Sequence, residues 1–462
     1  MRIGIRIRLA RRSLGVAILF VTSTLLLTPV AAVGDLSPAP KYSRLIGGGV
    51  PWSGEITGRS DLARNYGTLL RRLPRHPNGV ALDVVLGKAV PAGTANVARQ
   101  ALDHTEGYWL SVRGDMISLQ SNSDAGIARG LARLISLSAA GDHATVPKGE
   151  WADWPDLRIR ALLFVLGRHQ TLSTLRKVVD TVVDGQFNTL IVQVSPKSVA
   201  LSSFGDLADG NSLSQLDFER FVAYAAQSGL AVIPSLKLLT HQENLLADRR
   251  PDLMYNFRTY DPDNPKLYDL VLPMIDQLVS ITQSKAFMIN ADEVFGAHPN
   301  EKEKLRSLHQ DVLPAEAYLR GVLALHDHLR GLGVATWMWG DMFTSPKAFP
   351  KMFASSLHGD TAPGYGSTLL AHMPKDIVIC DWHYFGRDVA FPSLRLFSGL
   401  GFRVLGATWK NPAIIDSFSA YAARNGGDGM IATTWASSET QMQVIAEVAR
   451  ESAAAFWNAA RQ

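Results

Sequence analysis

The segment KAFMINADEVFGAH, residues 285–298, contains the pattern on which the predicted fold depends. It opens with an apolar run, 286–289, of the kind that forms a strand buried on both faces. Two adjacent acids, Asp292 and Glu293, follow closely. Burying an unpaired carboxylate costs free energy, so a buried strand that ends on two acids indicates either a functional site or an ion-paired one.

Seven further apolar runs alternate with helical stretches after residue 157. The eight runs are RALLFVL (160–166), TLIVQVS (189–195), AVIPSLK (231–237), AFMINAD (286–292), VATWMWG (334–340), DIVICDW (376–382), RVLGATWK (403–410) and GMIATTW (429–435). Eight apolar strands separated by helices predict a (β/α)8 TIM barrel over residues 155–462. A doubly wound open sheet is the alternative. No G-x-G-x-x-G follows the first run, which counts against nucleotide binding.

A small α+β domain is predicted over residues 44–154, before the barrel. Residues 79–87 are expected to form a strand, and residues 107–121 a hairpin that turns at Gly114-Asp115. Residues 123–140 have the apolar periodicity of a helix, with Ser123 as its N-cap. The segment VPKGEWADWPDLRIRA, 146–161, is interpreted as the connection to the barrel.

The first 32 residues are typical of a secretory signal peptide. Residues 1–12 hold five arginines and no acid, and an apolar stretch with small residues at Val30 and Ala32 follows. Cleavage after Ala32 would leave a linker, residues 33–43, and an exported protein of the bacterial periplasm or extracellular space with no stable membrane insertion. An uncleaved membrane anchor is the alternative reading. The formal net charge is +4, and without those five arginines it is 4 − 5 = −1, so no nucleic-acid partner is predicted.

The active site of such a barrel lies at the carboxyl ends of its strands. The candidate residues there are Arg168, His169, His241, Glu243, Asp292, Glu293, Trp337, Trp339, Asp341, Asp381, Trp382, His383, Tyr384, Trp409, Lys410 and Trp435, with Glu439 in the last loop. Five of the ten tryptophans fall in this set, at the ends of runs five to eight. Flat aromatic faces with carboxylates and an arginine between them suit a sugar, because the rings cover its C–H face and the charged groups bind its hydroxyls.

The two adjacent acids have a chemical consequence of their own. Because side chains alternate along a strand, Asn290 and Asp292 are expected to point into the barrel, and the loop can turn Glu293 toward the same opening. A carboxylate beside a carboxyl group makes ionisation of the second one costly, which favours a proton on one of them near neutral pH. Glycoside cleavage needs such a proton donor. A capping or salt-bridged pair stays an alternative.

No ligand set in the sequence has the spacing of a metal site. His326 and His328 stand two apart on a predicted helix, so they face different ways and are expected on the surface. The one cysteine, Cys380, lies inside an apolar run and is expected to be a small core residue. We therefore expect neither a metal nor another cofactor, and the oligomeric state stays open.

The chain resembles glycoside hydrolase family 20, the β-N-acetylhexosaminidases, and most of all its hexosaminidase D-like branch. The segments that carry the resemblance follow the barrel in order: RALLFVLGRH (160–169), VIPSLKLLTHQENLL (232–246), FMINADEVFG (287–296), WMWGDMF (337–343), DWHYFG (381–386), GATWKN (406–411) and GMIATTWASSE (429–439). The first module is similar to the small α+β domain that often precedes this barrel. The resemblance covers nearly the whole chain after the predicted signal peptide.

The resemblance implies an exo-acting enzyme that hydrolyses terminal non-reducing β-linked N-acetylhexosamine. Its catalysis would be substrate-assisted and retaining, through an oxazolinium-like intermediate, an exception to the two-carboxylate scheme. It implies that Glu293 is the general acid and then the base, that Asp292 holds the acetamido N–H, and that Tyr384 binds the acetamido carbonyl. The residues implied to bind or enclose the sugar are Arg168, His241, Trp339, Asp341, Trp382, Trp409 and Trp435.

Three departures from the family pattern keep other functions open. Run two ends in VQVSPKS without an acidic or histidine end, Thr240 stands where a glycine is common, and ASSE follows Trp435. The first alternative is a carbohydrate-binding pseudoenzyme of the same fold. The second is a barrel glycosidase that acts on unacetylated sugars with a protein nucleophile, for which Asp341, Asp381 and Glu439 are the candidates.

Overall fold

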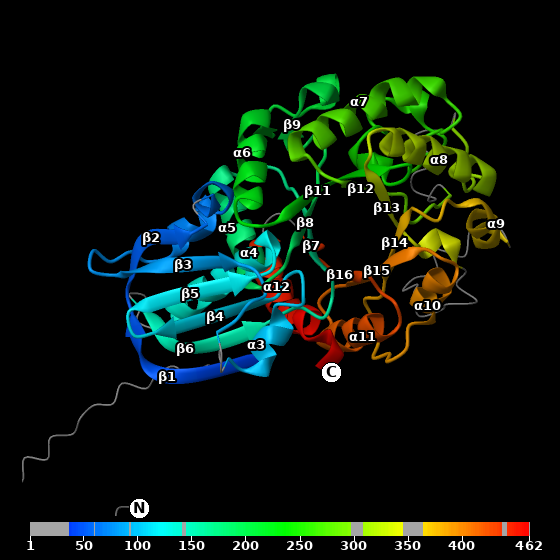
Figure 1. Ribbon diagram of the computed structural model, residues 1–462. Coiled ribbons are helices and arrows are strands. Elements are labelled where there is room, and N and C mark those ends of the chain that lie inside the picture. Colours follow the sequence, from blue (N-terminus) through cyan, green and yellow to red (C-terminus); the bar gives the residue numbers. More distant parts are fainter. Residues whose placement is uncertain are drawn as a thin grey trace, which may run out of the picture.

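The computed structural model describes residues 37–59, 61–91, 94–140, 145–296, 308–344, 364–436 and 441–461. It contains a six-stranded sheet beside a closed eight-stranded barrel (Figure 1). The predicted signal peptide, the first part of the linker and Glu439 lie outside the described residues. In the part of the chain that is described, no helix combines the length and the apolar character needed to cross a membrane.

The six-stranded sheet has the order β1-β6-β4-β5-β3-β2. The predicted hairpin is confirmed, because β4 and β5 pair antiparallel and Arg113 lies opposite Met116 across the turn. Helix α4 begins after Ser123, whose Oγ accepts a hydrogen bond of 3.1 Å from the Gly126 N–H. The elements of this domain are β1 Tyr42–Val50, β2 Trp52–Gly58, α1 Leu62–Asn65, α2 Gly67–Arg72, β3 Val80–Leu86, α3 Asn96–Ala101, β4 Tyr108–Arg113, β5 Met116–Ser121, α4 Asp124–Ala140 and β6 Val146–Asp153.

Three strands of this sheet, β1, β2 and β6, were not expected from the sequence. Strand β6 occupies the segment interpreted as a connection, and it pairs antiparallel with both β1 and β4. Strand β1 begins inside the predicted linker, and all but its first and last residues are exposed. Three glycines, 47–49, and this exposure remove the alternation of apolar residues that marks a strand, so β1 can be recognised only through its partner β6.

The predicted barrel is confirmed, with all eight strands in the predicted order. They are β7 Ile159–Val165, β8 Thr189–Gln193, β11 Ala231–Leu238, β12 Ala286–Asn290, β13 Ala335–Trp339, β14 Val378–Trp382, β15 Arg403–Thr408 and β16 Gly429–Thr433. Neighbouring strands pair in parallel, and β16 pairs with β7. This last pairing closes the sheet and excludes the doubly wound alternative.

One helix follows each strand and covers the outside of the barrel (Figure 1). These helices are α5 Leu172–Asp184, α6 Gln215–Ala226, α7 Pro265–Thr282, α8 Ala315–Gly331, α9 Tyr365–His372, α10 Pro392–Gly399, α11 Pro412–Arg424 and α12 Gln441–Trp457. Short pieces β9 Val199–Ala200 and β10 Leu213–Ser214 form a separate two-stranded sheet.

Alternate residues of each barrel strand fill its interior, as close packing of a (β/α)8 barrel requires. On β14, Val378, Cys380 and Trp382 belong to the interior cluster, whereas Ile379 belongs to the layer under the helices. Cys380 is fully buried, which confirms the expected core role. The same alternation decides which side chains at the strand ends face the site.

Two histidines of α8 differ from each other in burial. His326 was expected on the surface, and this prediction is wrong, because its side chain is 3% exposed. Its Nδ1 lies 2.9 Å from the Thr336 Oγ1 on β13, so the ring packs between helix and strand. His328 is partly exposed and lies 2.6 Å from the Asp276 carboxylate on α7.

A buried ionic network joins the small domain to the amino-terminal end of the barrel. Glu106 accepts two hydrogen bonds from the Arg160 guanidinium on β7, at 2.8 and 2.9 Å, and one of 3.0 Å from the Asn188 amide. Arg129 of α4 lies 3.7 Å from the same carboxylate. Both arginines are only 1% exposed, so Glu106 supplies the carboxylate that compensates two buried cations.

Replacing Glu106 with glutamine is expected to lower the free energy of unfolding by about 3 kcal/mol, because it leaves buried arginine charge without its counter-ion. Urea unfolding followed by circular dichroism measures this change. Glu55→Gln is the matched control, since Glu55 is an exposed acid of the same domain and should change stability by less than about 0.5 kcal/mol. Equal stability of the two variants would show that the network does not hold the domains together.

Candidate active site

The site is built on an unusual backbone turn after β12. Three of the four residues that follow Met288 and Ile289 have left-handed φ angles: Asn290 (64°), Ala291 (58°) and Glu293 (53°). Residues other than glycine rarely adopt this conformation, and strained backbone of this kind concentrates at functional sites. The turn explains how two adjacent residues, Asp292 and Glu293, both reach the same opening.

Several side chains hold this turn in place. The Tyr318 hydroxyl donates a hydrogen bond of 2.8 Å to the Ala291 carbonyl, and the Asp341 carboxyl accepts one of 2.9 Å from the Glu293 N–H. The Asn290 amide donates to the Ser235 Oγ at 2.9 Å and accepts from the Trp339 indole N–H at 3.1 Å. These contacts place Asn290 in the barrel interior, as expected.

His241 joins the two acids. Its Nε2 lies 3.5 Å from a carboxylate oxygen of Asp292 and 3.5 Å from one of Glu293, and its Nδ1 lies 3.5 Å from Glu243. Burial alone would lower the pKa of the imidazole, but the charge of Asp292 and the contact with Glu243 outweigh burial and raise the pKa to about 9. His241 is therefore an imidazolium at neutral pH. Glu243 contacts the other ring nitrogen and so helps to orient the imidazole.

The pKa values of the two acids are shifted in opposite directions. Burial would raise the pKa of Asp292, but the positive charges of Lys237 and His241 outweigh it and lower the pKa to about 2. Burial and the negative charge of Asp292 together raise the pKa of Glu293 above its ordinary value. Asp292 is thus a carboxylate beside a carboxyl group that retains its proton to higher pH, which is the arrangement that a general acid needs.

Asp341 is a third acid in contact with this turn, and it is buried. It is 1% exposed, and its contact with the Glu293 N–H supports a positioning role instead of the expected sugar-binding one. Burial and the charge of Asp292 raise the pKa of its carboxyl well above the ordinary range. A neutral carboxyl group is a poor nucleophile.

Aromatic side chains from β14, β15 and β16 form one wall. Trp382 and Tyr384 stack at 5.0 Å between ring centroids, and Trp409 meets the Tyr384 ring edge-on at 6.3 Å. The Trp435 indole N–H donates a hydrogen bond of 3.2 Å to the Tyr384 hydroxyl, and the Trp435 and Trp339 rings lie 6.3 Å apart. The fold thus brings together the four tryptophans predicted to enclose the sugar, Trp339, Trp382, Trp409 and Trp435, with Tyr384.

Two expected candidates face elsewhere. Arg168 follows β7, but its side chain is 52% exposed and its guanidinium forms an ion pair of 3.0 Å with Asp209. Asp381 lies on the outer face of β14, where it accepts a hydrogen bond of 2.8 Å from Ser393 of α10. Asp381 is therefore excluded as a nucleophile facing the barrel interior.

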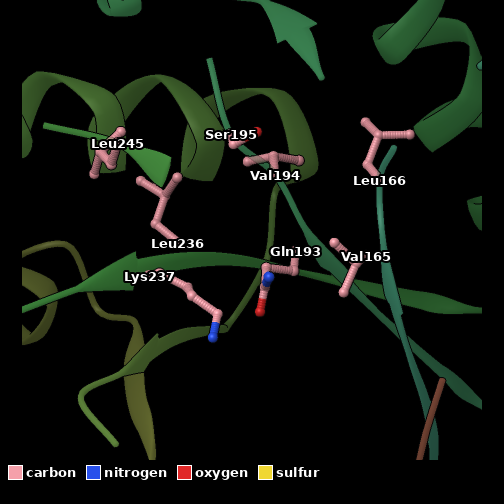
Figure 2. Close-up of a pocket in the computed structure, with 8 residues that line it drawn as sticks. All are labelled: Val165, Leu166, Gln193, Val194, Ser195, Leu236, Lys237 and Leu245. Atoms are coloured by element: carbon pink, nitrogen blue, oxygen red, sulfur yellow. The ribbon is translucent and has the colours of Figure 1, made fainter. Parts of the chain in front are cut away.

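Sequence reasoning missed Lys237 and Gln193. Both occupy inward-facing positions at the carboxyl ends of their strands, β11 and β8, and both line a cavity of about 180 Å³ (Figure 2). The signal was present in the alternation of Ile233, Ser235 and Lys237, of which Ile233 belongs to the interior cluster. Lys237 lies over the Trp435 ring, 5.8 Å from its centroid.

The fold also assembles a group that residue spacing could not reveal. One ligand-type atom from each of His241, Asp292 and Glu293 lies within 4.8 Å of the others. Metal binding requires an unprotonated imidazole, and the pKa of His241 is raised to about 9. At neutral pH these residues therefore suit an ion-pair network better than a metal site.

No profile of a known protein family matches the chain. A β-hexosaminidase of Vibrio furnissii is 22% identical to it over 40% of this chain, and the matched part covers 37% of that relative. The chain thus spans little more than a third of the length of the relative that it matches.

Solved structures show the fold more completely. The chitobiase of Flavobacterium johnsoniae, described as a family 20 enzyme, has a TM-score of 0.66 at 18% identity, covering 91% of this chain and 69% of that one. The family 20 β-N-acetylhexosaminidase of Streptomyces coelicolor has a TM-score of 0.64 at 16% identity, covering 92% and 91%. These matches cover more than nine tenths of this chain and show that it shares the fold of these two solved structures. Its narrower likeness to the hexosaminidase D-like branch stays a prediction.

Proposed function

We propose that this chain, which has the fold of the family 20 glycoside hydrolases, is an exo-acting β-N-acetylhexosaminidase. It would hydrolyse terminal non-reducing β-linked N-acetylhexosamine. The observation that carries the proposal is the charge state of the acid pair: an ionised Asp292 next to a Glu293 whose pKa is raised, at the mouth of a barrel walled by aromatic side chains. A family 20 exo-β-N-acetylglucosaminidase of Vibrio harveyi, solved with N-acetylglucosamine, has a TM-score of 0.65 to this chain at 16% identity, covering 92% of it and 74% of that chain.

The proposed mechanism uses the substrate's own acetamido group as the nucleophile. Its carbonyl oxygen attacks the anomeric carbon while Glu293 protonates the departing oxygen, and the Asp292 carboxylate stabilises the positive charge that develops on the acetamido nitrogen. The Tyr384 oxygen accepts from Trp435, so its own hydrogen can be donated to the acetamido carbonyl. Glu293, now ionised, then deprotonates the water that opens the intermediate.

The geometry bears on both alternatives. A protein nucleophile must be ionised and face the sugar, whereas Asp341 is buried with a pKa raised well above its ordinary range, and Asp381 faces α10. A pseudoenzyme would need no strained turn or tuned pair of acids, and both are present here. Substrate-assisted hydrolysis is the function that these residues support best.

Two matched aryl β-glycosides test this proposal directly. One carries a 2-acetamido group and the other a 2-hydroxyl group, with the same nitrophenolate leaving group. We expect hydrolysis of the first at least roughly 10³-fold faster, since only its acetamido group can act as nucleophile with a well-placed geometry. Comparable rates, or hydrolysis of the 2-hydroxyl substrate alone, would favour a protein nucleophile. Binding of N-acetylglucosamine without turnover would favour the pseudoenzyme.

We further propose that the protein is exported and that its signal is removed. The support is residues 1–32, with an arginine-rich start and an apolar stretch. N-terminal sequencing of the protein from a bacterial envelope fraction should give a chain that begins near Val33. A chain expressed without residues 1–32 is the control and should stay in the cytoplasm. Recovery of the full-length chain from the cytoplasm would contradict export.

A further inference from the structure

We propose that Gln193 and Lys237 are a hydroxyl-binding pair that recognises the non-reducing sugar. The inference rests on the proposed function and assigns substrate specificity to two residues that were not given a contact with the substrate above, although the charge of Lys237 also lowers the pKa of Asp292. Both come from the neighbouring strands β8 and β11, and the Lys237 ammonium reaches across to the Trp435 ring of the aromatic wall.

The strand register places the two side chains on one face. Gln193 is the last residue of β8 and lies opposite Ser235 of β11. Lys237 is two residues beyond Ser235, so it points to the same side of the sheet. Figure 2 shows both side chains extending in the same direction from neighbouring strands, and both residues line the cavity.

Each side chain has hydrogen-bonding capacity that the described residues leave unused. Gln193 is only 8% exposed, and its buried side-chain carbonyl oxygen accepts no hydrogen bond from the described residues. In the described ranges the Lys237 ammonium contacts the Trp435 ring and has no carboxylate within 4.0 Å. A buried acceptor without a donor costs free energy, which a bound group can recover.

The chemistry of this pair selects the kind of group that binds. A hydroxyl can accept a hydrogen bond from the Lys237 ammonium and donate its own hydrogen to the Gln193 carbonyl, so one group satisfies both. A carboxylate has no hydrogen to give to Gln193, and the nearby negative charge of Asp292 opposes it. The pair therefore fits a neutral sugar hydroxyl rather than an acidic substituent.

A cycle of enzyme variants and deoxygenated substrates tests the assignment. The substrates are 4-nitrophenyl 2-acetamido-2-deoxy-β-glucoside and its analogues that lack the 3-, 4- or 6-hydroxyl. With the wild type, we expect one analogue to lose roughly 10-fold or more in kcat/KM, the usual effect of one lost hydrogen bond with a charged donor. With Gln193→Leu or Lys237→Met, kcat/KM for the parent substrate should fall by a similar factor. For these variants, removing the same hydroxyl from the substrate should lower kcat/KM by a further factor of less than about three.

Lys285→Met is the matched control. Lys285 is exposed at the opposite end of the barrel, so this change should leave the discrimination between parent and analogue unchanged. Circular dichroism checks that each variant is folded. Because the test compares two substrates on one folded variant, a general loss of activity cannot imitate the expected result.

The possible failures are distinguishable. If the wild type does not hydrolyse the parent 2-acetamido substrate, the proposed function falls and this inference falls with it. If the wild type is active, but the Gln193 and Lys237 variants discriminate against every deoxy analogue as strongly as the wild type, only the hydroxyl-binding assignment is overturned.

Discussion

Replacing Glu293 with glutamine is expected to lower kcat by roughly 10²- to 10⁴-fold on substrates with poor leaving groups, the usual contribution of general acid catalysis. The amide keeps the shape of the side chain but cannot protonate the departing oxygen. A nitrophenolate leaves without much protonation, so the loss in its departure step should be smaller. Steady-state kinetics with an alkyl and a nitrophenyl glycoside measure the difference.

Glu243→Gln is the matched control for Glu293→Gln. Glu243 contacts the ring nitrogen of His241 that faces away from the acid pair. Any loss of kcat in this variant should therefore be the same for the alkyl and the nitrophenyl glycoside. Equal losses for both leaving groups in Glu293→Gln would contradict the role of this residue as the acid.

Asp292→Asn is expected to lower kcat by roughly 10²- to 10³-fold for both kinds of leaving group, as loss of a preorganised electrostatic contact does. The reason is that the acetamido attack is weakened whatever group departs. A substrate-derived thiazoline copies the cyclised intermediate, so it should inhibit the wild type and bind the variant much more weakly. Asp263→Asn is the control, since Asp263 is an exposed acid paired with Arg320 on the outside of the barrel.

The pH profile of Asp292→Asn gives an independent check. Glu293 must be protonated to act as the acid, so kcat/KM falls as the pH rises through its raised pKa. Removing the negative charge of Asp292 removes one of the causes of that raised pKa, and the basic limb should move to lower pH. A covalent glycosyl-enzyme detected by mass spectrometry at Asp341 or Glu439, with the thiazoline inert, would overturn the substrate-assisted mechanism.

The barrel and the acid pair were determined by the sequence alone. Each barrel strand is a short apolar run bounded by polar residues, and this signal is local, so eight strands could be placed without any knowledge of their partners. The chemical expectation for Asp292 and Glu293 was equally local, because adjacency in the chain already brings their charges together. Strands β1 and β6 could not be placed in this way, since β1 is mostly exposed and only its pairing with β6 defines it.

The charges around the acids were decided only by the tertiary structure. Lys237 on β11 and His241 in the loop after it lower the pKa of Asp292. Their spacing along the chain does not reveal that they lie beside Asp292. The left-handed turn that presents Glu293 depends on Tyr318 and Asp341, two side chains from other elements. The sequence of a strand end shows which side chain is there and which face of the sheet it points to. The pKa of that side chain depends on the charges from neighbouring strands, and closure of the barrel decides which strands are neighbours.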